Sequence, residues 1–315
     1  MNNYFISIFN HNWEQVYIKA FVGHLNGWGQ IRQGGLSNYP QIKDWWNNNL
    51  QNLVAPNIDK FVHPFYIGAG NPDSEIIFIG KEMAADKSNA NLMLYEQINN
   101  YIQWERIVSD YKQNPNQFST GDINNYIKNF ENNYDYCPLN PLTSSIIKQA
   151  LPKRGNHYWN VLQNILIKYY ALKGINLEIQ NFRRFPLYTE SLFRYCFTTE
   201  LNSTPAKHNG TLSIDRRSKL LCNIDFLNFI NRFKVIWFNC WVYLKKNFNQ
   251  ICDKYANYRE MIKQIFNADS VYACDKYEIY KSDNKVVIVS NNLSGAGRGI
   301  IGKSDILNII DRIKE

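Results

Sequence analysis

A short, uninterrupted apolar run near residue 76 is the feature that most restricts the fold of this chain. The stretch from Asp73 to Asp86 reads DSEIIFIGKEMAAD, and its β-branched and aromatic residues stand between the turn residues 71–73 and Gly80. Such a run is typical of a central parallel strand, which is buried on both faces. Ligands of open α/β sheets bind beyond the carboxyl ends of such strands, so we expect Glu82 to lie at a site. The alternative is an exposed carboxylate in an ordinary turn.

A second stretch near the carboxyl terminus repeats this pattern. Residues 286–302 read VVIVSNNLSGAGRGIIG, in which an apolar strand at 286–289 runs into a polar turn. A glycine-rich bend follows, and a last helix is expected over 305–314. Two strands of one kind, each ending in a polar segment, predict that both segments meet at one edge of a sheet.

Between these two stretches, helical and strand patterns alternate. Helices are expected at 158–172, 220–230 and 258–266, and strands at 192–199 and 232–244. This alternation favours a mostly parallel sheet with helices on both faces. The fold class expected is therefore α/β, as a three-layer sandwich with a central sheet.

The rest of the chain is expected to be helical decoration of this core. Residues 1–64 read as an N-terminal helical extension packed on the core, and residues 65–315 as the α/β domain. A helical insertion is expected at about 87–156, with helical patterns at 92–108 and 123–130.

Composition limits the partners and the chemistry. The formal net charge of +8 and the pI near 9.0 suit a polyanionic partner. The 6 cysteines form no Cys-x-x-Cys pair and have no histidine at ligand spacing, so we expect no metal and no cofactor, but buried free thiols. We expect no secretory leader and no membrane-spanning segment, because residues 1–13 lack a basic start followed by a long apolar run and no later apolar run is long enough to cross a bilayer. We therefore expect a cytoplasmic monomer that does not bind membranes.

The two motifs together resemble a known family. A first strand that runs into Gly-x-carboxylate, and a late strand that runs through a polar turn into Leu-Ser-x-x-x-Arg-Gly, are similar to the two active-site motifs of the uracil-DNA glycosylase superfamily. The resemblance covers about residues 65–315 without the insertion. It implies a uracil-DNA glycosylase-like sheet and a DNA partner whose nucleotide is turned out of the helix.

The resemblance indicates Glu82 as the first catalytic candidate and leaves Asp86 as the second. Breaking an N-glycosidic bond develops positive charge on the sugar and negative charge on the leaving base, so an anion must lie beneath the sugar. Glu82 matches the family's Gly-x-carboxylate position and would orient water or stabilise the oxocarbenium-like sugar. The family commonly has Asp or Asn there, and the longer side chain moves the carboxylate by roughly 1.5 Å. Asp86 is the second catalytic candidate.

Three segments supply candidates for contacting the base. Phe65 and Tyr66 precede the first strand and could stack on a base. The turn after the strand at 192–199 matches the place where the family reads the base with Asn, and offers Thr199, Glu200 or Asn202. The late motif of the family begins with His-Pro, whereas this chain has Ser290, Asn291 and Asn292.

The departure at the late motif changes the expected substrate. Asn side chains carry donors and acceptors and can read a base edge other than that of uracil. Loss of the histidine therefore predicts a non-standard base, damaged or hypermodified, with glucosylated hydroxymethylcytosine of phage DNA as one hypothesis and antiviral defence as its setting. No lysine stands out as a Schiff-base nucleophile, so a monofunctional glycosylase is expected.

The remaining candidates contact DNA. Leu293 matches the wedge leucine of the family, which fills the stack after the nucleotide is extruded. Ser294, Gly295, Gly297 and Arg298 would bind the flanking phosphates.

Two other classes of protein stay open from the sequence. One is a catalytically silent DNA-binding module on the same fold. The other is a nucleotide-phosphate hydrolase on a Rossmann-like sheet, against which stands the lack of a Walker lysine pattern and of a complete dinucleotide fingerprint.

Overall fold

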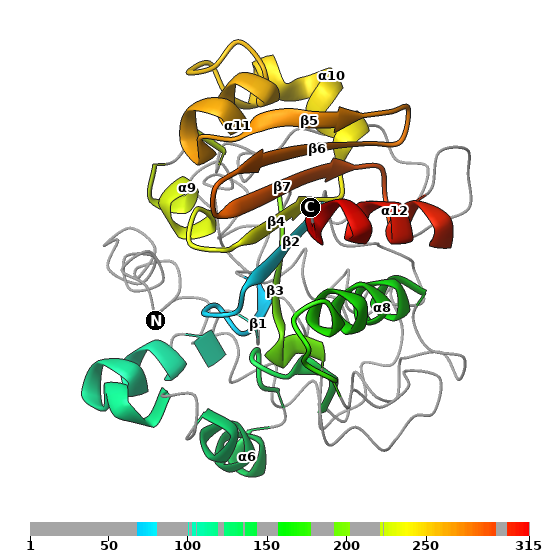
Figure 1. Ribbon diagram of the computed structural model, residues 1–315. Helices are drawn as coiled ribbons and strands as arrows, with labels where there is room; N and C mark the ends of the chain where they lie inside the picture. The colour runs from blue at the N-terminus through cyan, green and yellow to red at the C-terminus, as the bar shows by residue number, and fades with distance from the viewer. Residues whose placement is uncertain are drawn as a thin grey trace, which may run out of the picture.

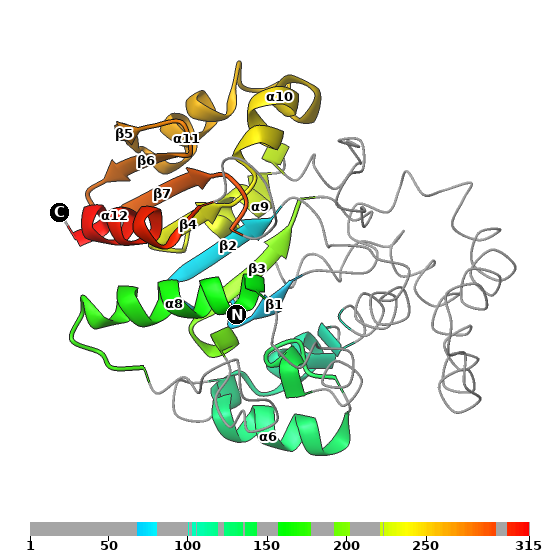
Figure 2. The same ribbon diagram turned by 90° about the vertical axis from the view of Figure 1, so that its right-hand side faces the viewer.

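A computed structural model gives the fold (Figure 1, Figure 2). It describes residues 68–80, 100, 103–104, 106–118, 123–134, 136–143, 157–177, 192–201, 221–222, 224–293 and 301–314. The predicted N-terminal extension, 1–64, lies outside the described residues.

The described strands form one seven-stranded sheet in the order β1-β3-β2-β4-β7-β6-β5. In chain order the strands are β1 (Ala69–Gly70), β2 (Ile76–Gly80), β3 (Cys196–Glu200), β4 (Val235–Phe238), β5 (Asp269–Ala273), β6 (Tyr277–Ser282) and β7 (Lys285–Ser290). The four central strands β3, β2, β4 and β7 are parallel, whereas β1, β6 and β5 pair antiparallel at the edges. The prediction of an α/β chain with a mostly parallel central sheet is confirmed in this form.

Helices cover both faces of the sheet. The described helices are α6 (Ile123–Asn133), α8 (His157–Ala171), α9 (Ile224–Ile230), α10 (Trp241–Ile251), α11 (Tyr258–Phe266) and α12 (Lys303–Lys314), with short 3-10 turns η3 (Pro115–Phe118), η4 (Pro141–Thr143) and η5 (Leu192–Arg194). Helices α8 and α12 pack on one face, and α9, α10, α11 and α6 contribute to the core on the other. Figure 1 shows α8 and α12 next to each other on the right of the molecule.

Alternation along the strands explains the two cores. In β4, Val235 and Trp237 pack with α8 and α12, whereas Ile236 and Phe238 pack with α9, α10 and α11. Successive side chains of a strand point to opposite faces, so a strand with apolar residues at every position is buried on both sides. This is the physical reason for the uninterrupted runs in the sequence.

The connections from β2 to β3 and from β3 to β4 run in opposite directions across the sheet, which creates a topological switch point. Helix α8 joins β2 to β3 on one face, and α9 then returns the chain past β2 to β4 on the other face. The order of the four parallel strands therefore reverses between β2 and β4. In doubly wound sheets the crevice beyond the carboxyl ends of the two strands at such a point is where ligands bind.

Several boundaries differ from the prediction. The strand expected over 232–244 is wrong beyond Phe238, because Asn239 and Cys240 end β4 and Trp241 begins α10. The first residues of the strand expected at 192–199 form η5 instead, and β3 begins at Cys196. The hairpin of β6 and β7 was not predicted.

The segment predicted as an insertion contains helices among its described residues, although residues 136–140 are not helical. Helix α6 lies within it, and residues 106–113 are also helical. Trp104 is fully buried and its Nε1 donates to the carbonyl oxygen of Gly68 at 2.8 Å, so this segment is tied to the start of β1. Among the described residues no helix has the length and apolarity to cross a membrane.

Candidate active site

A row of residues crosses the carboxyl edge of the four parallel strands. Gly80 of β2 pairs with Glu200 of β3, and the backbone N–H of Asn239 after β4 donates to Ile79 at 2.9 Å. Phe238 pairs with Val289, so Asn239 stands beside Ser290 of β7. Alternation directs all four row positions toward the face covered by α8 and α12. The row therefore runs Glu200, Gly80, Asn239, Ser290 across the switch point.

Glycine at position 80 makes room for Glu200. A β-carbon there would collide with the carboxylate of Glu200, which lies over the α-carbon of Gly80. The carboxylate thus extends along the row toward β4, about one strand spacing or roughly 4.8 Å away. Glu200 was named in the sequence only as an alternative for the base-reading turn, yet it is a carboxylate at the switch point.

Asn239 is a buried amide at the end of β4. Its side chain is 4% exposed, and its Nδ2 donates to the hydroxyl oxygen of Tyr158 on α8 at 2.8 Å. Its Oδ1 is buried and accepts no hydrogen bond from any described residue. A buried amide oxygen without a donor is costly, by about 1–3 kcal/mol, so its persistence calls for an explanation.

Ser290 is engaged within the protein. It is 0% exposed, its Oγ accepts from Trp237 Nε1 at 2.8 Å, and its hydroxyl donates to the carbonyl oxygen of Asn291 at 2.9 Å. The hydroxyl therefore satisfies a buried indole and fixes the turn after β7. Its proposed contact with a base remains a prediction, and the geometry gives it a structural task.

The described base-binding candidates are not all gathered in one place. Thr199 is buried, and alternation along β3 directs it to the face covered by α9 and α10, away from Ser290. Asn291 is half-buried with an Oδ1 that lacks a partner among the described residues, and its backbone N–H donates to Lys276 at 3.0 Å. Asn292 is exposed.

Leu293 lies in the core beneath α8 and α12. It is 1% exposed, and it belongs to the same apolar cluster as Ile301. The backbone N–H of Ile301 donates to the carbonyl oxygen of Asn292 at 3.5 Å, so residues 292 and 301 lie side by side. In this position Leu293 is a core residue, and a wedge role would require its side chain to leave the core.

Most of the predicted site lies outside the described residues. These positions are Phe65, Tyr66, Glu82, Asp86, Asn202, Ser294, Gly295, Gly297 and Arg298. Their roles stay predictions. Strands β2, β4 and β7 are parallel, so β2 and β7 end at the same edge of the sheet.

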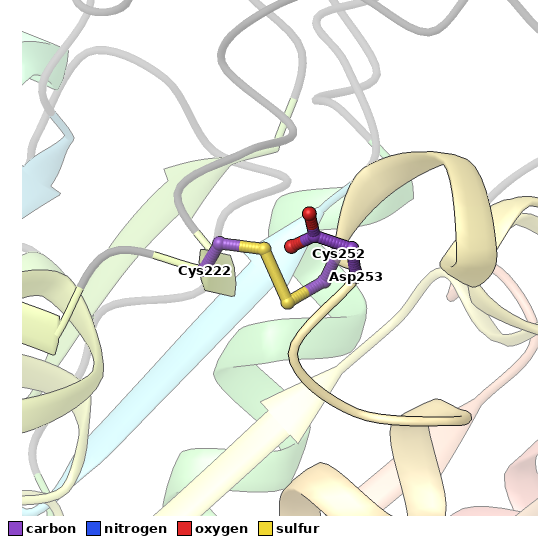
Figure 3. Close-up of side chains that lie close together, drawn as sticks. All are labelled: Cys222, Cys252 and Asp253. Atoms are coloured by element: carbon purple, nitrogen blue, oxygen red, sulfur yellow. A yellow bond between two sulfur atoms is a disulfide. The ribbon is translucent and has the colours of Figure 1, made fainter.

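The cysteines offer no obvious metal site within the described part of the chain. The three potential ligands that lie close together there are Cys222, Cys252 and Asp253, and the two sulfurs are joined in a disulfide (Figure 3). The prediction of free thiols is wrong for this pair, which lies 30 residues apart in sequence but 5.4 Å apart between α-carbons. A disulfide has no thiolate to offer a metal.

The other four cysteines form no disulfide. Burial raises the pKa of the thiols of Cys137 and Cys196 well above the usual range, so both are protonated at neutral pH. A protonated, buried thiol is neither a nucleophile nor a metal ligand. These two cysteines therefore serve as small core residues.

Sequence reasoning missed Asn239 and Tyr158. The sequence placed Asn239 at a turn after the strand but gave it no role in the site, although Trp241, Leu244 and Phe248 have the spacing of a helix that begins just after it. A polar residue between a strand and a helix is the signal that would have identified it. Tyr158 could not be connected with it, because the two are 81 residues apart.

Comparisons with known proteins leave the family open. No family model, no curated protein and no solved structure matches this chain.

Proposed function

We propose that the protein is a monofunctional DNA glycosylase that hydrolyses the N-glycosidic bond of a flipped-out, non-standard base and leaves an abasic site. The observation that carries the proposal is the switch point between β2 and β4. The segments that carry both sequence motifs start at this edge, one after β2 and the other after β7. The resemblance to the uracil-DNA glycosylase superfamily supplies the reaction.

The proposed chemistry assigns one task to each segment. The carboxylate of Glu82 orients a water molecule or stabilises the developing charge of the sugar. The loop 294–298 binds the phosphates around the extruded nucleotide through backbone amides and Arg298. Polar groups at the ends of β4 and β7 contact the base. The net charge of +8 favours association with DNA.

The test incubates the purified protein with DNAs that carry uracil, mismatched bases, hydroxymethylcytosine or glucosylated hydroxymethylcytosine. Released bases and abasic sites are then measured. We expect release of one kind of base, and a loss of at least roughly 100-fold in the rate for Glu82→Gln, because general acid–base catalysis is worth about 10²–10⁴-fold.

The matched control is Asp311→Asn. Asp311 is an exposed carboxylate on α12, so the same chemical change there should leave the rate unaltered. The proposal fails if the wild-type protein releases no base from any DNA. If release occurs and Glu82→Gln retains it while Asp86→Asn loses it, Asp86 takes the catalytic role.

A further inference from the structure

One covalent bond joins the two ends of the segment that carries β4. The disulfide between Cys222 and Cys252 spans 30 residues of sequence. Cys222 stands just before α9, Cys252 is the C-cap residue of α10, and β4 lies between these two helices in the chain. Both helices pack on the same face of the sheet. The disulfide therefore fastens together the two helices that precede and follow a central strand of the switch point.

The noncovalent contacts at this corner are of two kinds. Lys254 Nζ donates to the carbonyl oxygen of Cys222 at 2.8 Å in an exposed position, where water competes for both groups. Leu221 and Ile251 are buried in the same apolar cluster as α9 and α10. Loss of the covalent bond would leave the two helices held together mainly by apolar packing.

The surroundings of the two sulfurs also suit a reduced pair. Cys222 Sγ lies 3.4 Å from the carbonyl oxygen of Ile251, and Cys252 Sγ lies 3.8 Å from the carbonyl oxygen of Leu221. After reduction each sulfur carries an S–H donor, and each of these carbonyl oxygens can accept from the thiol of the opposite segment. The two thiols are thereby held where the disulfide can form again.

Access and charge determine how the disulfide is attacked. Cys222 is half-buried whereas Cys252 is 2% exposed, so a reductant reaches the sulfur of Cys222. The carboxylate of Asp253 lies within 4.8 Å of both sulfurs and repels an approaching thiolate (Figure 3). The bond is therefore within reach of a thiol reductant, and the neighbouring negative charge slows the attack.

We infer that the Cys222–Cys252 disulfide is a reversible redox switch, which fastens α9 and α10 around β4 when oxidised and loosens them when reduced. A dithiol reductant drives the reduction. Its thiolate attacks Cys222 Sγ, and the electron pair of the S–S bond leaves with Cys252 Sγ, which takes up a proton. The second thiol of the reductant then displaces Cys222 as a thiol, and the reductant departs as a disulfide. The protein gains two electrons and two protons, and oxidised glutathione reverses the exchange.

The experiment compares the full-length protein after equilibration with dithiothreitol or with oxidised glutathione. Thiol alkylation and mass spectrometry give the redox state of each cysteine. We expect the equilibrium constant for unfolding in urea to be roughly 100-fold larger after reduction, because the closed loop restricts the unfolded chain. Hydrogen exchange should be at least about 10-fold faster for the amides of α9 and α10, and should change less for those of α8 and α12 on the other face.

Three variants assign the response to this pair. The double variant Cys222→Ser, Cys252→Ser should behave like the reduced wild-type protein and should not respond to reductant. Cys274→Ser is the matched control and should keep the full response, since Cys274 is a half-buried thiol outside the pair. Asp253→Asn should be reduced roughly 2- to 5-fold faster at low ionic strength, whereas Asp311→Asn on α12 should match the wild-type protein.

The outcomes concern the disulfide alone. Equal unfolding constants and equal exchange rates in the two redox states would overturn the inference, and so would a redox response that persists in the double variant. Thiols at Cys222 and Cys252 after treatment with oxidised glutathione would overturn it as well. The wild-type comparison decides alone if the double variant does not fold. None of these measurements uses DNA, so the inference and the proposed function can fail independently.

Discussion

Replacing Ser290 by Ala tests whether this residue holds the site together or reads the base. The hydroxyl is fully buried between Trp237 Nε1 and the carbonyl oxygen of Asn291. Removing it leaves the indole N–H of a fully buried tryptophan without an acceptor. An unsatisfied buried donor costs about 1–3 kcal/mol. The carbonyl oxygen of Asn291 loses one hydrogen bond but can accept another through its second lone pair, so its cost is smaller. We expect the free energy of unfolding to fall by about 2 kcal/mol.

The assay is urea denaturation of the wild-type protein, Ser290→Ala and a matched serine variant. Ser282→Ala is that control, because the Ser282 hydroxyl is buried without a partner among the described residues and its removal should cost about 0 kcal/mol. Equal stability of the two variants would refute the structural role of Ser290. A variant of unchanged stability that excises bases more slowly would instead support the base contact predicted from the sequence.

Three further predictions concern stability. Burial acts to raise the pKa of Glu75, but the hydrogen bonds and charges of Lys173 and Lys234 outweigh it and lower the pKa below 4.5. The ionised carboxylate therefore stabilises the fold above that pH by on the order of 0.5–1 kcal/mol, and this contribution is lost as the pH falls further. The free energy of unfolding, measured in urea at several pH values, should thus fall less steeply below pH 4.5 for Glu75→Gln than for the wild-type protein. Glu278→Leu should destabilise by about 3 kcal/mol in urea, because this buried carboxylate accepts from two tyrosine hydroxyls. Leu293→Ala should cost about 2–4 kcal/mol by the same measurement, and slower excision from duplex but not single-stranded DNA would add a wedge role.

The sheet could be predicted from the sequence because its central strands are apolar at every position. Residues 76–79 and 286–289 have no polar alternation, which is the pattern of strands buried on both faces. Helix α11 begins and ends at the predicted residues, since Tyr258, Met261, Ile262 and Phe266 repeat at helical spacing.

The edge of the sheet was harder to predict. Strand β6 carries the buried Glu278 as its second residue. This carboxylate is tolerated because Arg259 and the tyrosines Tyr258 and Tyr280 donate hydrogen bonds to it. Tyr258 and Arg259 belong to α11, 20 and 19 residues before Glu278, so local sequence gave no reason to expect a strand there. The two-residue turn Asp283-Asn284 between β6 and β7 was the available local signal.

The candidate site was predictable only in part. The motifs indicated which strand ends form the candidate site, since β2 and β7 are parallel to β4 and end at the same edge of the sheet. The row at that edge depends on the register of strands far apart in the chain, which brings Glu200 over Gly80 and Asn239 beside Ser290. Register is set by pairing and packing across the sheet, and short motifs do not encode it.

The most direct test of the central claim is the intact mass of an oligonucleotide after incubation with the protein. A monofunctional glycosylase should leave a full-length strand whose mass is lower by that of one base and higher by one water, and Glu82→Gln should leave the strand unchanged. A cleaved strand would indicate a lyase step. Unchanged mass for every modified DNA, with a folded wild-type protein, would contradict the assignment of glycosylase activity.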